Sequence, residues 1–177
     1  MKKTITAIAA LCLALFIAGC ASGPSPVMVE VQGARTTRPD TLVGAASNAD
    51  KNTSETRAKA QIVSALTSIT RNMLSDFKAG GGNAVASDAL EVAIIQALGR
   101  SRLSGIEKAK QLEEKKKGKT PATWWTVLYL NKASAQQEIK QIETALKGNI
   151  PGASSFSTDT FFERRFQEAS AREWVSN

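Results

Sequence analysis

Histidine is absent from the 177 residues, and cysteine occurs only at Cys12 and Cys20. Without histidine the chain cannot form a Ser-His-Asp or Cys-His nucleophile system, a two-histidine zinc motif or a histidine general base. Serine and lysine are plentiful, but no Ser/Lys or carboxylate pair is distinguished by its spacing. We therefore assign no catalytic residue, no metal ligand and no cofactor, and we expect that the protein is not an enzyme.

A clustered basic surface is also missing. Lys and Arg number 23 against 16 Asp and Glu, and these charges are scattered except at Lys115-Lys116-Lys117. A nucleic-acid-binding domain typically gathers its basic residues and places aromatic side chains among them. The sequence therefore predicts no nucleic-acid partner.

The first 19 residues have the three parts of a secretory signal peptide. Lys2 and Lys3 are followed by an apolar run from Ile5 to Ile17, and the small residues Ala18 and Gly19 come next. The run is shorter than the roughly 20 residues that a membrane-spanning helix needs. Removal of residues 1–19 takes away two lysines and no acid, which lowers the formal charge from +7 to +5.

The stretch Ile17-Ala18-Gly19-Cys20 resembles a bacterial lipobox. This resemblance implies a thioether-linked diacylglycerol on Cys20 and a palmitate-type acyl chain on its new amino terminus. Three chains hold a protein to a bilayer far more firmly than one. Ala21 stands where an aspartate commonly retains such proteins in the inner membrane, so the resemblance implies an outer-membrane lipoprotein facing the periplasm. Cys12 lies in the removed segment, so no disulfide is expected.

The mature chain divides into a lipidated tether (20–26), an α+β domain (27–150) and a C-terminal amphipathic tail (151–177). For the domain we expect a small antiparallel sheet packed by two or three helices. Val27, Val29 and Val31 alternate with polar residues, a pattern that predicts a strand over 27–32. A second strand is predicted from Thr41 to Ala45.

Three helices are predicted in the domain. The first has candidate caps at Asn52, Thr53 and Ser54, and its apolar stripe recurs at three- and four-residue steps until Gly80. The second spans 89–98, capped by Ser87-Asp88 and ended by Gly99, and we expect it to be deeply buried because it is apolar on nearly all sides. The third begins at Asn131 or Ser134 and ends at Gly148.

The segment 104–117, which lies between the second and third predicted helices, fits either a helix or a strand. Ser104 and Glu107 form a capping-box pattern that favours a helix. The run 124–130 predicts a strong strand with bulky side chains on both sides, which needs a central place in the sheet or cover on two faces. Such a strand needs a partner, and the nearest candidate is 104–114.

The tail carries Phe161, Phe162, Phe166 and Trp174 beside Arg164, Arg165 and Arg172. Two interpretations stay open for this basic amphipathic segment. It folds back onto the domain, or it docks on a partner or the membrane surface.

Several stretches resemble the twenty-kilodalton outer-membrane lipoprotein (LPP-twenty) family. They are Asp40 to Ser47, Thr56 to Gln61, Leu103 to Ile106 and the aromatic strand 124–130 with the helix after Asn131. The resemblance implies a lipobox followed by a small α+β domain, and it favours a strand over 104–114. Some members of that family contribute to flagellar-motor or envelope assemblies.

These observations lead to two functional hypotheses. The first is a lipid-anchored, non-catalytic periplasmic domain in envelope structure or assembly, such as that of the flagellar motor. Its partners are the bilayer, through acylated Cys20, and a second copy or an envelope protein. The alternative is a binding module for a small or lipidic ligand, lined by Trp124, Trp125, Tyr129 and the tail aromatics.

Overall fold

A computed structural model describes residues 26–115 and 122–171. Its elements in chain order are α2 (Pro26–Thr37), β1 (Thr41–Asn48), α3 (Lys51–Ala79), α4 (Ala84–Arg100), β2 (Ile106–Glu114), β3 (Thr123–Asn131), α5 (Lys132–Lys147) and α6 (Thr158–Ser170). These helices and the antiparallel sheet confirm the predicted α+β class. Cys20, the predicted signal peptide and Trp174 lie outside the described residues.

The sheet has the order β1-β3-β2, with both neighbours antiparallel to β3. The aromatic strand therefore has the predicted central place. Its partner β2 confirms the strand interpretation of 104–114, against local helix propensity. Ser104 does not cap a helix, because its hydroxyl donates to Glu138 on α5, 3.0 Å away.

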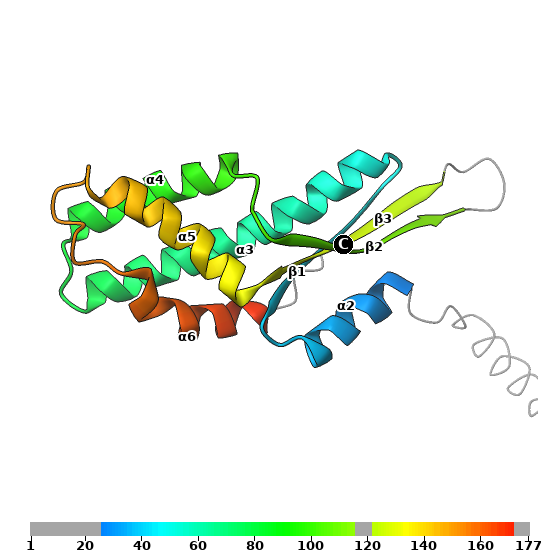
Figure 1. Ribbon diagram of the computed structural model, residues 1–177, viewed down its shortest axis with the longest axis horizontal. Helices are drawn as coiled ribbons and strands as arrows, with labels where there is room; N and C mark the ends of the chain where they lie inside the picture. The colour runs from blue at the N-terminus through cyan, green and yellow to red at the C-terminus, as the bar shows by residue number, and fades with distance from the viewer. Residues whose placement is uncertain (1–25, 116–121, 172–177) are drawn as a thin grey trace, which may run out of the picture.

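Helices cover the two faces of the sheet unequally (Figure 1). The long α3 crosses one face and extends beyond the sheet, where α4, α5 and α6 pack with it into a helical body. The short α2 lies on the opposite face. Each face therefore has its own apolar cluster, the larger one lying around α3.

The helix α3 begins earlier than predicted. Asp50 is its N-cap, and the Asp50 carboxylate accepts a hydrogen bond from the Thr53 backbone amide at 2.7 Å. The predicted cap Ser54 is instead fully buried, and its hydroxyl lies 2.7 Å from that of Thr126 on β3. This contact joins the helix to the central strand.

The predicted strand over 27–32 is wrong, because these residues belong to α2. The helix starts at Pro26, a favourable first helical position for proline. Val31 and Ala34, one turn apart, pack on the sheet. The alternating valines gave a strand signal, but the second sheet face needed an apolar cover, and the helix provides it.

The helix α4 also differs from its prediction. It runs from Ala84 to Arg100, its N-cap is Asn83, and Gly99 lies inside it. Only one side of α4 is buried, because it packs on the outside of the helical body, and Val85 remains 80% exposed. By contrast α5 begins at the predicted cap, since the Asn131 side chain accepts from the Ser134 amide at 2.8 Å.

The C-terminal segment folds back onto the domain. Phe156, Phe162 and Phe166 are almost completely buried in the core around α3. Arg165 binds Asp76 of α3 through its Nε at 2.7 Å and through a second bond, and Arg164 also pairs with Asp76. The described part of the tail is therefore a packed helix rather than a free docking segment.

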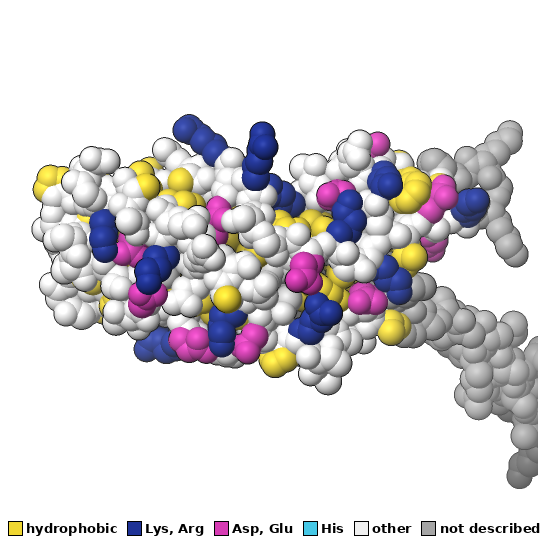
Figure 2. Space-filling view, in the orientation of Figure 1, with side chains coloured by type: hydrophobic (Ala, Val, Ile, Leu, Met, Phe, Trp, Pro, Cys, Tyr) yellow, Lys and Arg dark blue, Asp and Glu magenta, His cyan; other side chains and the backbone are white. Residues whose placement is uncertain are grey.

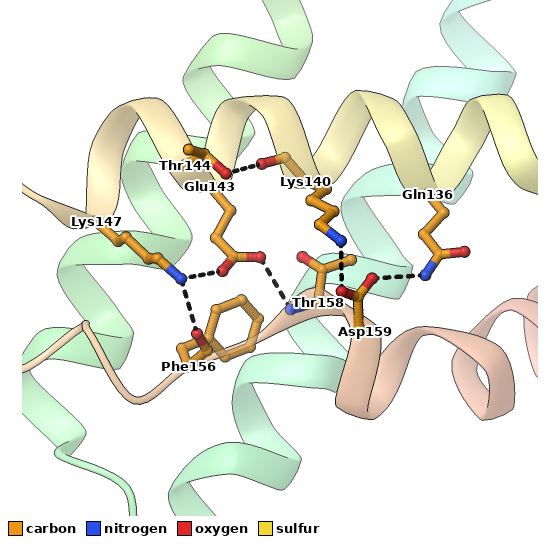
Figure 3. Close-up of polar contacts among 8 residues, drawn as sticks. All are labelled: Gln136, Lys140, Glu143, Thr144, Lys147, Phe156, Thr158 and Asp159. Carbon is orange, nitrogen blue, oxygen red and sulfur yellow. Dashed lines mark hydrogen bonds and ion pairs between the residues drawn. The ribbon is translucent and has the colours of Figure 1, made fainter.

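A carboxylate on α5 holds the start of α6 (Figure 3). Ser157, the N-cap of α6, makes no capping bond with its side chain. Glu143 replaces that cap, because its carboxylate accepts from the Thr158 amide at 2.9 Å and pairs with Lys147 at 2.9 Å. Glu143 is 3% exposed, so its carboxylate joins α5 to the start of α6 inside the protein as well as pairing with Lys147 on its own helix.

Candidate functional site at the amino-terminal helix

The helix α2 is the first described element after the predicted lipobox, and its direction follows from its connection to β1. Residues 38–40 join its C-terminal end to the start of β1 at Thr41, and Thr41 pairs with Asn131. The helix therefore runs back along the sheet, and Pro26 lies toward the other sheet end, where Asn48 pairs with Trp124. Only five residues, 21–25, separate Pro26 from Cys20.

A polar groove lies between α2 and the sheet. Its hollow of 320 Å³ is lined by residues of α2 and by Arg38, Lys110 and Tyr129. The Tyr129 hydroxyl donates to the Glu30 carboxylate at 2.9 Å, and Lys110 Nζ lies 3.5 Å from the same side chain. The Arg38 guanidinium sits 5.1 Å from the centre of the Tyr129 ring.

The groove keeps Tyr129 protonated. Burial of the phenol, first, and its hydrogen bond to Glu30 together raise the pKa of Tyr129 to about 12. A phenol with this pKa remains a hydrogen-bond donor at neutral pH and is a poor base or nucleophile. The arrangement therefore fastens α2 to the sheet.

The sheet end near Pro26 carries two tryptophans on opposite faces of β3. Trp124 lies beside Lys51 at the start of α3, with Lys51 Nζ 5.4 Å from the ring centre. Trp125 packs on the α2 side with Leu112, and its indole Nε1 donates to Glu114 at 3.0 Å. Both tryptophans are partly exposed.

The structure does not gather the predicted ligand-binding aromatics into one cavity. Trp124 and Trp125 lie on opposite sides of the sheet, and Tyr129 is farther along β3 in the α2 groove. The tail rings pack elsewhere, since Phe156 and Phe161 stack at 6.1 Å between ring centres and both contact Phe77. Sequence analysis missed the α2 groove, because it placed Glu30 on a strand.

A second hollow, of 410 Å³, lies between α3 and β2. Ile106 and Leu128 line it together with the charged Glu55, Lys59 and Arg102. Glu55 is occupied by an ion pair with Lys108. The visible face of the molecule carries a band of apolar atoms in its middle, with basic and acidic side chains interspersed (Figure 2). This face shows no patch of a single charge sign that would indicate a partner of the opposite charge.

Within the described ranges, no helix is long and apolar enough to cross a bilayer. Across the same ranges, no group of three or more Cys, Asp or Glu side chains is placed to hold a metal ion. The pKa values of Lys78, Lys132 and Lys140 are raised, in each case chiefly by a hydrogen bond to a carboxylate. A raised pKa keeps these ammonium groups protonated, so fewer neutral amines are present at neutral pH to accept a proton.

Comparisons with known proteins give no match. No family model matches the chain, and neither a curated protein nor a solved structure matches it at a significant level. The resemblance to the LPP-twenty family therefore stays a prediction drawn from the sequence.

Proposed function

We propose that the chain is a lipid-anchored outer-membrane lipoprotein whose periplasmic, non-catalytic domain serves envelope structure or assembly. The observation that carries the proposal is the order Lys2-Lys3, apolar run, Ala18-Gly19 and Cys20. Ala21 supports the outer membrane as the destination. The setting in a flagellar-motor assembly rests on the family resemblance alone.

The fold is consistent with an anchored role. The helix α2 begins six residues after Cys20 and is held to the sheet by Val31, Ala34 and the Glu30–Tyr129 hydrogen bond. An acyl anchor on Cys20 would thus be linked through a short tether to an element that is packed on the domain. The rest of the molecule, including the helical body, stays available to envelope partners.

Metabolic labelling with an alkyne fatty acid tests the anchor. We expect wild-type protein to incorporate the label, to lose residues 1–19 and to fractionate with the outer membrane. Cys20→Ala should lose the label and accumulate as the longer precursor. Cys12→Ala is the matched control, because it removes the other cysteine from the segment that is cut away, and it should label normally. Normal labelling and maturation of Cys20→Ala would overturn the proposal.

A further inference from the structure

We infer that the sheet end carrying Trp124 and Trp125 lies in the headgroup layer of the membrane that holds Cys20, with both indoles as interfacial contacts. This inference rests on the proposed function, because it requires the anchor. The proposed binding partner is the lipid surface of the bilayer.

The covalent geometry of the chain limits how far this end can lie from the bilayer. An extended chain covers at most about 3.6 Å per residue, so the six steps from Cys20 to Pro26 span no more than about 22 Å. Pro26 therefore stays near the membrane surface whatever path the tether takes.

The direction of α2 then determines which part of the domain is nearest. Its N-terminal end lies toward the end of the sheet where Asn48 pairs with Trp124, and α3 starts at this same end (Figure 1). The opposite end of α3 is far away, because a helix of 29 residues is about 43 Å long. The helical body thus points away from the anchor, and the tryptophan end points toward it.

The residues at the near end suit a membrane interface. Trp124 and Trp125 are partly exposed on the two faces of β3. Val29, in the first turns of α2, is 54% exposed. Tryptophan prefers the boundary between water and hydrocarbon, because its ring is apolar and its N–H needs a polar partner.

The described charges at this end are of both signs. The described cations Lys51 and Lys115 are accompanied by Asp50, Glu113 and Glu114. Because these described charges nearly balance, we expect the indoles to supply the contact and the contact to persist in zwitterionic lipid and at high salt.

Quenching by brominated lipid tests this inference. The full-length, lipidated protein is prepared with Trp174→Phe, so that only Trp124 and Trp125 report. It is reconstituted into phosphatidylcholine vesicles with or without bromine on the acyl chains. We expect a loss of tryptophan emission that grows with the bromolipid fraction, unchanged by salt. Adding Trp124→Phe or Trp125→Phe should leave the remaining indole quenched.

A tryptophan at the far end gives the matched control. Val85→Trp, in a background with all three native tryptophans changed to Phe, places an indole at an 80% exposed position at the start of α4. We expect this probe to be unaffected by bromolipid. Flotation of the vesicles separates the two proposals. If the protein floats with the vesicles but Trp124 and Trp125 are not quenched, the interfacial inference alone is overturned. If the protein does not float with the vesicles, the anchor and the inference are overturned together.

Discussion

Gly44 shows how closely a single residue can set the distance between two elements. A β-carbon placed on Gly44 of β1 would lie 2.1 Å from the backbone oxygen of Ala58 on α3. Backbone atoms cannot move aside as a flexible side chain can. The absence of a side chain at this position therefore lets α3 lie directly on the strand.

We expect Gly44→Ala to lower the free energy of unfolding by about 3 kcal/mol, because the added methyl group separates α3 from β1. Urea denaturation followed by circular dichroism measures the effect. Gly33→Ala is the matched control, since nothing lies within 4 Å of that site and it sits in a helix. The control should be neutral or stabilising by up to about 1 kcal/mol. Equal stability of Gly44→Ala and wild type would contradict the close approach.

At the scale of whole elements, α2 is held on the sheet by few contacts. Among the side chains of α2 whose burial is described, Val31 and Ala34 are the buried apolar ones, and Tyr129 donates a hydrogen bond to Glu30 from the central strand. A helix with so small a buried face is expected to open independently of the core.

Tyr129→Phe should loosen α2 without unfolding the protein. Loss of one hydrogen bond is worth about 1 kcal/mol, which corresponds to roughly five-fold faster amide exchange across residues 26–37. Hydrogen exchange with mass spectrometry measures this directly. Thr36→Ala is the control, because that hydroxyl donates only to the Gln32 carbonyl within α2. If the exchange rates of the two variants agree, the Tyr129–Glu30 bond does not hold the helix.

The elements also show what periodicity can and cannot predict. The amphipathic stripe of α3 and the bulky strand β3 depend on long, regular patterns, and both are present as expected. The valines of 27–32 satisfy the strand pattern. The segment is nevertheless a helix, because tertiary contacts place it as the cover of the second sheet face, which the local pattern does not reveal. The segment 106–114 is the opposite case: it forms a strand, because pairing with β3 outweighs its helix propensity.

Caps and burial were less predictable than the elements themselves. Asp50 and Asn83 cap α3 and α4, although other polar residues nearby were equally plausible. Nothing in the apolar sequence of α4 indicates that Val85 and Val92 face outward. The α2 groove could not be predicted either, because Glu30 and Tyr129 are brought together only by the position of the helix.

Over the whole molecule, one carboxylate ties the C-terminal helix to the core. The pKa of Asp76 is held below its ordinary value, first by the hydrogen bond from Arg165 and also by that from Arg164. A lowered pKa in the folded state contributes stability that is present above the unfolded value of 3.8 and is lost as pH falls through the folded value.

Asp76→Asn should therefore destabilise the protein at neutral pH by about 1–3 kcal/mol, because it leaves Arg165 without its anionic partner. The difference from wild type should shrink as pH falls below the unfolded value of 3.8 and through the lower pKa of the folded carboxyl. Urea unfolding across pH 2–7 checks both points. Asp159→Asn, which loses an exposed ion pair with Lys140, should destabilise the protein less than Asp76→Asn does. A constant difference between Asp76→Asn and wild type over the whole pH range would exclude this linkage.

The path of α2 has a mechanical consequence for a tethered protein. Tension applied between a membrane anchor and the helical body enters the domain at Pro26, at the end of α2 that is remote from its covalent link to β1. The force would therefore act along α2 and load first the contacts between this helix and the sheet. Converting 12 helical residues to extended chain releases about 24 Å of slack. Such a segment would extend under tension before the core unfolds.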